Sequence, residues 1–476
     1  MPSEEAILEV LYGAYIFCLI YLVGVSVLYV ILALAASVEA ALRNRQNRAE
    51  DFETLATSRF TIPVSVIAPA YNEDVLIVAS VRSLLAIEYP ELEVIVVNDG
   101  STDRTLDLLK REFDLEPRLV FFRRLLPSGQ VRAIYRSKKE PRLVVVDKEN
   151  GGKADALNCG INLSRYRYIC CVDADTFYDR KALLKAMRLA LKDPARVIAV
   201  TSPVAISSQP EARQRADWGE KAIDRKPFID FQYMDYLRAF LNNRLAWSRY
   251  GFMLCVTGVF SIWRRDVVQE LGGFSTRFTC EDVELTFRAH HHFRKARKPY
   301  QILSLPDVVG STEGPTRLRS LIAQRSRWQR TILESIWAYR QMFLNPRYGS
   351  VGLVGMPYYV IYEGLAPLVE FVSVLVLAVA WWLDVIAWQE FVLFIGIVAF
   401  ANGILTNVAV LLQDRTSRSY GVGSLAGLIF LGALEFLVYR PIIFVARWKG
   451  WIGFLRHDRA WHKFARNSRA GGRAAS

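Results

Sequence analysis

Apolar segments long enough to cross a lipid bilayer stand on both sides of a polar middle region, and this arrangement constrains the fold more than any other feature. The first segment runs from Leu11 to Val38 and exceeds the ~20 residues that a helix needs to cross the hydrocarbon core. Three more lie near residues 358–383, 391–412 and 424–445. Because 52% of the 476 residues are hydrophobic, a high share for a soluble protein, we expect an integral membrane protein with one polar domain.

Basic residues beside the first apolar segment predict the orientation of the chain. Arg43, Arg45 and Arg48 follow it directly, and the positive-inside tendency then places the next domain in the cytoplasm. A cleavable signal peptide is the alternative, but acidic residues precede the segment where a signal peptide has a basic start. A retained anchor is therefore favoured.

The basic tail at residues 447–476 conflicts with a simple count of spans. Three spans after a cytoplasmic domain would put this tail outside, whereas its many cations favour the inside. One segment is then expected to lie in the membrane interface or to re-enter. Candidate breaks are Pro357, Gly364 and Pro367 in the first of the three segments and Pro441 in the last, and the sequence does not choose between them.

Three glutamates, Glu363, Glu370 and Glu435, fall within or beside these apolar segments. Carboxylates are costly there unless they face protein or water. They could line a polar path, or they could pair with Arg440 or with interfacial water, and the sequence leaves both interpretations open.

Short β-branched runs alternate with helical patterns in the polar middle region. The runs are Val64–Ala68, Val94–Val97, Leu143–Val146 and Tyr168–Val172, with helical periodicity at 76–86 and 106–113. Such buried runs indicate strands of a mostly parallel sheet, so we expect an α/β domain whose ligand site lies at the carboxyl ends of the strands. Residues 117–141 are interpreted as a basic loop with a solvated or lipid-facing surface.

Acidic residues follow two of these strand ends directly. Asp173-Ala174-Asp175 offers hard oxygen ligands for Mg²⁺ or Mn²⁺, although loop capping explains most isolated Asp-x-Asp triplets. Asp99 lies in an Asn-Asp-Gly-Ser sequence that is also a good turn. Both interpretations can hold together, because a tight turn would aim Asp99 at a uracil or a ribose.

Two further segments offer groups for a nucleotide. Tyr71 and Glu73 end the first strand and are suited to stacking on and hydrogen-bonding a nucleobase. Gly151-Gly152-Lys153 opens a helix, so its amides and the Lys153 ammonium can approach a phosphate or sugar hydroxyls. The same residues would serve equally as a turn and helix cap.

The remaining candidates lie further along the chain. Glu281 and Asp282 begin a helical pattern, and one of two close carboxylates can have its pKa raised, which makes Asp282 our candidate general base. Acidity that complements a helix N-terminus is the alternative. Residues 318–342 alternate cationic and apolar positions, as in a helix lying in the membrane interface. On it, Gln324 and Arg327 can clamp a diphosphate beside Trp328, whose alternative role is an interface anchor.

With these blocks assembled, the chain resembles the processive, membrane-integrated members of glycosyltransferase family 2, which include cellulose, hyaluronan, chitin and poly-N-acetylglucosamine synthases. The resemblance extends from the anchor before Val64 to the apolar segments after Trp328. One departure is visible, because Cys280 stands where cellulose-type synthases have threonine before Glu-Asp. This departure weakens a glucose assignment without supporting another sugar.

The resemblance implies a GT-A fold between transmembrane helices, Mg²⁺ or Mn²⁺ as cofactor, and a UDP-sugar donor, either UDP-glucose or UDP-N-acetylglucosamine. It also implies inversion to a β-linked polysaccharide that is exported as it grows. By the family pattern, the donor would contact Tyr71, Glu73, Asp99, Asp173, Gln324 and Arg327, with Asp173 and Asp175 at the metal. Lys153 joins the donor-binding residues by its place at the helix start. Asp282, beside Glu281, would be the catalytic base, and Thr257, Gly258 and Trp328 would lie under the acceptor.

The same resemblance divides the chain into five parts: an anchor at 1–40, a cytosolic GT-A domain at 41–317, an interfacial helix region at 318–350, membrane helices at 351–446 and a basic amphipathic tail at 447–476. The expected location is the plasma membrane with the catalytic domain in the cytoplasm. The expected partners are the UDP-sugar, the growing polysaccharide, the bilayer and accessory export proteins, with no nucleic acid.

Two other functions stay open on the sequence. One is the transfer of a single sugar to a membrane lipid carrier. The other is a membrane scaffold with a degenerate transferase domain, which the complete acidic set of Asp99, Asp173, Asp175 and Asp282 disfavours.

Overall fold

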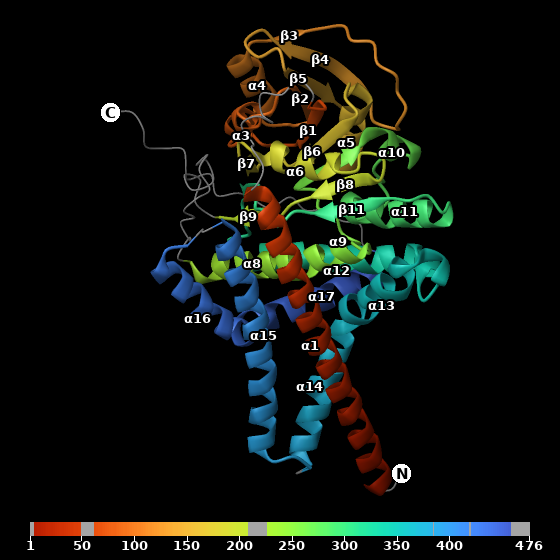
Figure 1. The fold of residues 1–476 in the computed structure, drawn as a ribbon, viewed down its shortest axis with the longest axis vertical. Helices are drawn as coiled ribbons and strands as arrows, with labels where there is room; N and C mark the ends of the chain where they lie inside the picture. The colour runs from red at the N-terminus through yellow and green to blue at the C-terminus, as the bar shows by residue number, and fades with distance from the viewer. Residues whose placement is uncertain (1–3, 49–60, 208–225, 384, 418–419, 458–476) are drawn as a thin grey trace.

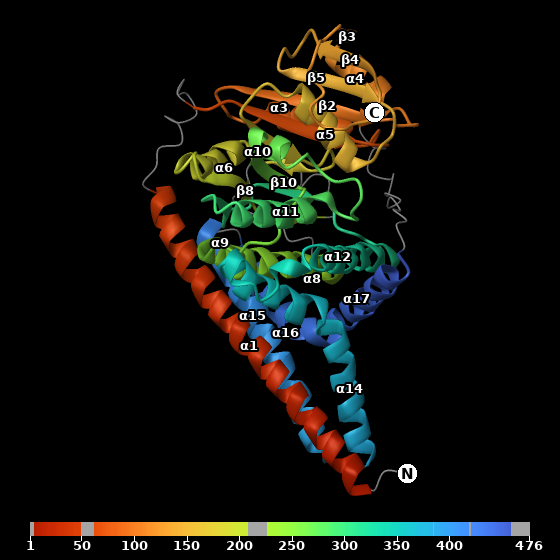
Figure 2. The ribbon, with the colours of Figure 1, turned by 90° about the vertical axis from the view of Figure 1, so that its right-hand side faces the viewer.

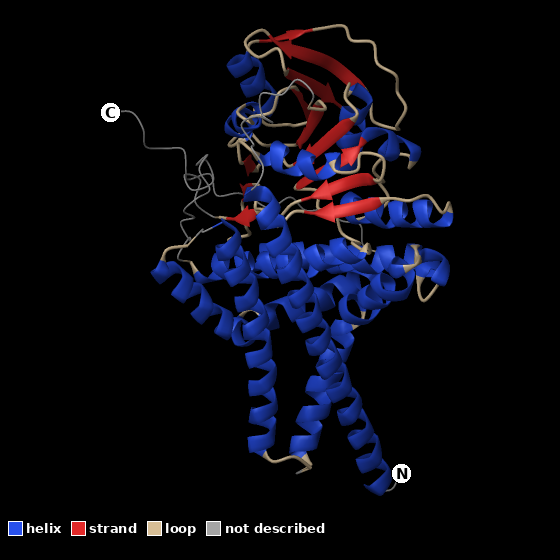
Figure 3. Cartoon of the chain, viewed as in Figure 1, coloured by secondary structure: helices blue, strands red, loops and turns tan. Residues whose placement is uncertain are grey.

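The structure is a computed structural model, which describes residues 4–48, 61–207, 226–383, 385–417 and 420–457. An α/β domain occupies one end of the molecule, and long helices extend from the other (Figure 1). Strands are confined to the α/β domain, whereas everything below it is helical (Figure 3). Most of the basic tail, from residue 458, lies outside the described residues.

A nine-stranded mixed sheet forms the centre of the α/β domain, in the order β11-β8-β10-β6-β1-β2-β5-β4-β3. Its parallel core is β6 (Tyr168–Val172), β1 (Val64–Ala70), β2 (Leu92–Asp99) and β5 (Leu143–Lys148). The outer strands are β3 (Leu115–Pro117), β4 (Val131–Ser137), β8 (Val197–Thr201), β10 (Phe260–Arg264) and β11 (Gln301–Ser304). A small second sheet contains β7 (Phe177–Tyr178), β9 (Ala205–Ile206) and β12 (Gly310–Thr312).

Side chains along the buried strands alternate between the two faces of the sheet, so the domain has one hydrophobic core on each face. Val66 pairs with Val94 and Cys170, and these side chains pack with the helices α3 and α4 and with α6. Ile67 and Ile95 point the other way, toward α5 and α11. The helices named here are α3 (Ile77–Leu85), α4 (Thr105–Phe113), α5 (Lys153–Leu163), α6 (Ala182–Leu191) and α11 (Glu281–Lys295), and the short helix α10 (Arg265–Glu270) follows β10.

The four predicted strands are confirmed, and they form the parallel core of the sheet. The loop prediction for residues 117–141 was partly wrong, because β4 lies within this range and pairs with β5. Its β-branched residues Val131 and Ile134 are widely spaced among cations, so the strand pattern was hidden. β3 and β4 lie at the end of the molecule opposite the long helices, which favours a solvated over a lipid-facing surface (Figures 1 and 2).

Three helices extend away from the α/β domain: α1 (Glu4–Arg48), α14 (Ala366–Trp382) and α15 (Trp388–Ser417) (Figure 2). Two helices in the described residues are long and apolar enough to cross a membrane, namely α1 over Glu9–Arg43 and α15 over Trp388–Arg415. The number rises to four if each of two bent helix pairs counts as one span. The predicted apolar segments are thus helical, as expected.

A helical layer lies between the domain and these long helices. It contains α12 (Leu318–Ala338), where the interfacial helix was predicted, and α8 (Pro227–Leu237), η1 (Arg238–Arg244) and α9 (Leu245–Tyr250). Short turns lead from α12 to α14: η2 (Arg340–Met342), η3 (Pro346–Tyr348), η4 (Val351–Gly355), α13 (Met356–Tyr358) and η5 (Tyr359–Gly364).

Both candidate segments for the break are bent. α16 (Val422–Val438) and α17 (Arg440–Leu455) meet at 49°, and residues 351–364 meet α14 at 47°. α17 packs along α12, and both α16 and α17 lie level with the helical layer (Figure 2). The bends fall at the predicted breaks near Gly364 and Pro441, and which of the two segments lies in the membrane interface stays a prediction.

A close approach between α5 and β1 gives a test of this packing. A Cβ atom at Gly160 would lie 2.4 Å from Ile67 Cγ2 and 3.3 Å from Val97 Cγ2, inside a filled core. We expect Gly160→Ala to lower the free energy of unfolding by about 1–3 kcal/mol through overpacking. The measurement is thermal unfolding of the purified protein. Gly13→Ala, where a Cβ meets nothing within 4 Å, should not lower the midpoint.

Candidate active site

One cavity of about 1560 Å³ contains every residue that the sequence predicted for the site. It begins at the carboxyl ends of β1, β2 and β6, passes the start of α11 and the middle of α12, and continues between α1, α14 and α15. The strand ends meet there because parallel strands deliver their carboxyl ends to the same edge of a sheet. Residues as far apart in the sequence as Tyr71 and Trp328 therefore line the same cavity.

The two loops after β1 and β2 are tied to each other at the domain end of the cavity. The Asn72 amide donates to Ser101 Oγ at 2.9 Å, and the Thr102 amide donates back to Asn72 Oδ1 at 2.8 Å. Asn72 adopts a positive φ of 52°, which asparagine tolerates better than most residues. These contacts hold Tyr71 at the cavity wall.

Lys153 is the cation around which the acidic residues gather. Its ammonium lies 2.6 Å from Asp173 Oδ1 and 3.5 Å from Glu281 Oε1. Lys153 is the first residue of α5, directly after Gly152 at φ +85°, so a left-handed glycine turn aims it into the cavity. The pKa of Lys153 is well above its ordinary value, because the charges of Asp173, Glu281 and Asp282 outweigh the effect of burial.

Asp282 is fixed by two backbone donors at the start of α11. The Gly258 amide donates to Asp282 Oδ2 at 2.6 Å, and the Val283 amide donates to Oδ1 at 2.8 Å. The neighbouring Glu281 carries the raised pKa of the pair. Burial raises it most, the Lys153 ammonium opposes this, and the Asp282 charge adds to it. The pair thus starts α11, as one interpretation predicts, whereas the raised pKa that the other invoked falls on Glu281; the choice of base stays a prediction.

Cys280, the departure from the cellulose-type pattern, is a partly buried thiol beside this pair. Burial and the neighbouring carboxylates raise its pKa to about 12. A raised pKa disfavours the thiolate form, which is the reactive form of cysteine.

The helix α12 brings its predicted residues, Gln324, Arg327 and Trp328, to the opposite wall of the cavity. Trp328 keeps 37% of its surface exposed. The guanidinium of Arg325 lies 4.1 Å from the centre of the indole, and Tyr236 packs at 5.6 Å from it. The indole is therefore held by a cation and a phenol ring, which fits a stacking platform better than a loose interface anchor.

Arg325, Asp235 and Tyr236 are site residues that the sequence did not indicate. Arg325 is 5% exposed, pairs with Asp235 Oδ2 at 3.0 Å and donates to Tyr439 Oη at 3.1 Å. The Gln-x-x-Arg-Trp pattern predicts the cationic role for Arg327 and gives none to Arg325, which lies between its positions. Helical spacing alone does not show whether Arg325 or Arg327 points toward α8 and α17.

A second contact that the sequence did not indicate joins α12 to the loop before α11. Glu334 accepts hydrogen bonds from the amide and the hydroxyl of Thr279 at 2.9 and 2.8 Å, and Arg330 Nε donates to the same hydroxyl at 2.9 Å. Thr279, two residues before Glu281, is therefore tied to the helix that carries Trp328.

Two of the three glutamates of the apolar segments, Glu363 and Glu370, line the lower part of the cavity. Each lies 3.6 Å from Arg447, and the fully buried Glu435 pairs with Arg440 at 2.5 Å. Both arginines also line the cavity. The pairing that the sequence offered as one alternative is thus present for Glu435, and a polar path stays a prediction.

The donor set for a metal consists of Asp173 and Asp175 on the loop after β6. Among the described residues, no group of three or more His, Cys, Asp or Glu side chains could hold a metal ion. Two carboxylates suit Mg²⁺ or Mn²⁺, which commonly complete their shells with substrate phosphates and water, and they do not suit a structural zinc ion. The residues present therefore fit a metal that arrives with a phosphorylated substrate.

Comparison with known proteins agrees with this geometry. Residues 65–272 match the family model described as glycosyl transferase family 2. The chain is 26% identical over 280 residues to a poly-β-1,6-N-acetyl-D-glucosamine synthase of Staphylococcus epidermidis, covering 58% of this chain and 57% of that protein. A synthase of the same description from Staphylococcus aureus strain COL is 26% identical over 266 residues, covering 56% of this chain and 53% of the relative.

A solved structure of a mannosyltransferase from Pyrobaculum calidifontis, in complex with GDP-Man and Mn²⁺, superimposes with a TM-score of 0.49 at 19% identity, covering 88% of this chain and 99% of that one. The chain spans little more than half the length of the curated relatives it matches. By its sheet and its family match, the α/β domain is a glycosyltransferase domain of the GT-A fold. Residues 65–272 form its glycosyltransferase family 2 domain.

Gly258 offers a test of the carboxylate arrangement. A Cβ at this position would lie 2.9 Å from Lys153 Nζ and 3.2 Å from Asp282 Oδ2. The ammonium is the end of a flexible side chain and can move away, so we expect Gly258→Ala to fold normally while Lys153 and Asp282 shift. Nucleotide release from the donor should fall about 10- to 100-fold, because small displacements of reacting groups are costly. Unchanged turnover in a folded variant would contradict this geometry.

Proposed function

We propose that this protein is a processive, inverting glycosyltransferase, which polymerises a β-linked polysaccharide from UDP-glucose or UDP-N-acetylglucosamine and exports it across the membrane. The proposal rests above all on the convergence of the acidic residues and the Gln-x-x-Arg-Trp segment on one cavity that continues between α1, α14 and α15. The family match and the synthases among the relatives support a polysaccharide product.

The donor would bind at the domain end of the cavity. Tyr71, Glu73 and Asp99 would hold the uridine, while Lys153, Gln324 and Arg327 would supply positive charge and hydrogen bonds to the diphosphate and sugar. Asp173 and Asp175 would hold Mg²⁺ or Mn²⁺, which when bound neutralises the charge of the departing diphosphate.

The transfer step would use Asp282 as the general base. An acceptor hydroxyl loses its proton to the Asp282 carboxylate while its oxygen forms a bond to the anomeric carbon. The bond from that carbon to the diphosphate breaks at the same time, and UDP leaves with the electron pair. Attack from the side opposite the diphosphate inverts the configuration, which yields a β-linkage from an α-linked donor.

The acceptor would lie over Trp328, with Thr257 and Gly258 beneath the reacting end. Stacking on an indole holds a sugar ring by its apolar face and does not depend on which unit of the polysaccharide the ring belongs to. The polysaccharide can therefore advance by one unit after each transfer. The charged lower part of the cavity, with Glu363, Glu370 and Arg447, would provide hydrogen-bonding groups along the path into the membrane.

Transfer of one sugar to a membrane lipid is the second candidate, and one observation favours it. Below the charged residues, the cavity is walled by apolar side chains of α1, α14 and α15, including Leu22, Leu377 and Ile395. Such a wall suits the hydrocarbon tail of a lipid carrier as well as an emerging polymer.

The base assignment is tested with Asp282→Asn, which keeps the size of the side chain and removes its basicity. We expect transfer from the UDP-sugar to fall about 10²- to 10⁴-fold, the contribution typical of a general base. The affinity for UDP, measured by calorimetry, should change little. Asp107→Asn on the exposed surface of α4 is the matched control and should be as active as the wild type. Normal transfer by Asp282→Asn would exclude this residue as the base.

Product length separates the two candidate functions. Incubation with radiolabelled UDP-sugar should give long polymers from the wild type and shorter ones from Trp328→Ala, because the stacking platform is lost. Trp337→Ala is a matched control, since this exposed tryptophan lies on the same helix and outside the cavity. Lipid products that carry a single sugar, with no polymer from the wild type, would favour the second candidate.

A further inference from the structure

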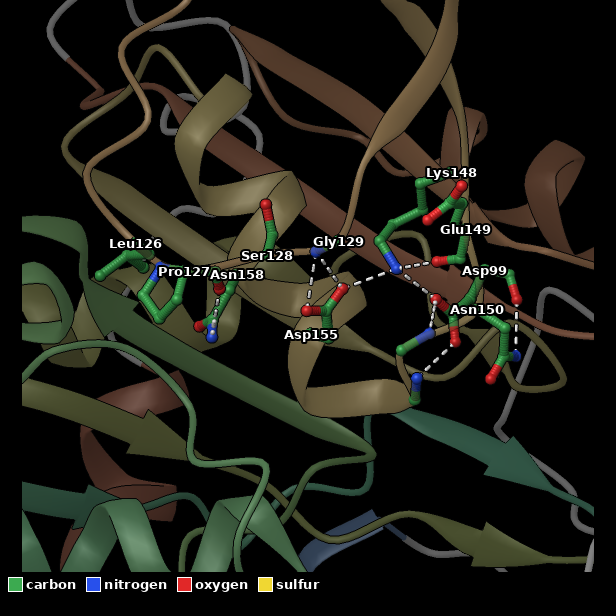
Figure 4. Close-up of polar contacts among 12 residues, drawn as sticks. Asp99, Leu126, Pro127, Ser128, Gly129, Lys148, Glu149, Asn150, Asp155 and Asn158 are labelled. Atoms are coloured by element: carbon green, nitrogen blue, oxygen red, sulfur yellow. Dashed lines mark hydrogen bonds and ion pairs between the residues drawn. The ribbon is translucent and has the colours of Figure 1, made fainter.

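Lys148 is a buried lysine that the proposed mechanism does not use. It ends β5, is 0% exposed, and has its ammonium 2.5 Å from Asp99 Oδ1 and 2.6 Å from Asp155 Oδ1 (Figure 4). It also donates to the carbonyl of Glu149. A buried cation between two carboxylates is an expensive arrangement that is retained only where it is fully paired. This pairing constrains Asp99, whose carboxylate forms one of the two ion pairs.

The hydrogen bonds of Asp99 leave little room for a ligand. A carboxylate has about four acceptor positions, two on each oxygen. Oδ1 accepts from Lys148 and from the Gly151 amide at 3.0 Å, while Oδ2 accepts from the Gly152 amide at 2.8 Å (Figure 4). Within the described residues these three donors account for three of the positions. One acceptor position on Oδ2 remains, on a residue that lines the cavity.

One acceptor position does not suit every nucleobase. Uracil presents a single imide N–H at N3, which one carboxylate oxygen can accept. Guanine presents two adjacent donors, N1–H and the 2-amino group, which need both carboxylate oxygens for a paired contact. Cytosine carries a lone pair at N3 where uracil has a proton, so a fixed carboxylate oxygen would repel it. A carboxylate that could rotate would discriminate less among these bases.

We infer that Lys148 is a positioning residue for nucleobase specificity: by holding Asp99 Oδ1 it leaves one oriented acceptor, which selects a uridine donor over cytidine and guanosine donors. This inference rests on the proposed use of a nucleotide-sugar and adds the residue that sets its base. The role of Lys148 is indirect, because it acts through Asp99 and does not itself line the cavity.

The surroundings of Lys148 support an orienting role. Asp155, its second partner, accepts from the Gly129 amide with both oxygens at 2.9 Å, so the cluster is anchored to the loop before β4 (Figure 4). Asn150 Nδ2 donates to the Asp99 carbonyl at 2.8 Å, which fixes the backbone of the same residue. Both the backbone and one carboxylate oxygen of Asp99 are thus held from behind the site.

The test compares the affinities for UDP and CDP, which have the same ring size, by calorimetry on the full-length protein in detergent. The wild type should bind UDP at least about tenfold more tightly, because a fixed charged acceptor rewards one base and repels the other. In Lys148→Met, Asp99 Oδ1 loses its cation and keeps only the Gly151 amide, so the carboxylate is held less firmly and the UDP-to-CDP affinity ratio should contract by about tenfold. If Lys148 had only a structural role, Lys148→Met would lower the affinities for UDP and CDP equally and leave their ratio unchanged.

Asp155→Asn is the matched control, because it disturbs the same buried cluster while Lys148 still pairs with Asp99. Asp155→Asn should keep the wild-type ratio of UDP to CDP affinity. If Lys148→Met does not fold, the wild type with N3-methyl-UDP still tests the single acceptor, and binding should weaken about tenfold. Three outcomes would each overturn the inference. The wild type could bind UDP and CDP equally, it could bind N3-methyl-UDP as tightly as UDP, or folded Lys148→Met could keep the wild-type UDP-to-CDP affinity ratio.

The outcomes also distinguish this inference from the proposed function. A wild type that prefers UDP but transfers no sugar would contradict the proposed function and leave the specificity role of Lys148 standing. If the wild type makes polymer and Lys148→Met leaves the UDP-to-CDP affinity ratio unchanged, the proposed function stands and the specificity role of Lys148 is contradicted.

Discussion

The site depends on Lys153, because its ammonium allows three carboxylates to share one partly enclosed space. Asp173, Glu281 and Asp282 come from two distant parts of the chain, and without a cation their mutual repulsion would keep them apart or protonated. The glycine turn before α5 and the amide of Gly258 then set the positions of the cation and of Asp282. A small displacement of this one cation would change every acidic group around it.

The helix α12 joins this charged centre to the membrane side of the molecule. On one side, Glu334 and Arg330 hold Thr279, two residues before the carboxylate pair. On the other, Arg325 reaches Tyr439 at the junction of α16 and α17, and its guanidinium lies over Trp328. Trp328 and the residues that contact Thr279 and Tyr439 therefore lie on one helix, which links the loop before α11 to the helices at the membrane side.

Much of the fold and of the site could be predicted from the sequence, because their signals are local. β-branched runs such as Val94–Val97 mark buried strands wherever they occur, and a polar residue at the end of a parallel strand must lie at the ligand edge. That is why Asp99 and Asp173 were placed together before any contact was known. β4 was missed because its apolar residues are diluted by cations, and its pairing with β5 stabilises a strand that its own composition does not indicate.

By itself, the sequence determined the apolar helices, the α/β domain between them and the set of acidic residues that share one cavity. Only the tertiary structure decided that Arg325 supports Trp328, that the last apolar segment breaks at Pro441, and that Lys148 occupies one oxygen of Asp99. The physical reason is distance along the chain: Lys148 and Asp99 are 49 residues apart, and Arg325 and Tyr439 are 114 apart. Periodicity and spacing reveal what one segment prefers, whereas the partner of a buried charge depends on how separate segments pack.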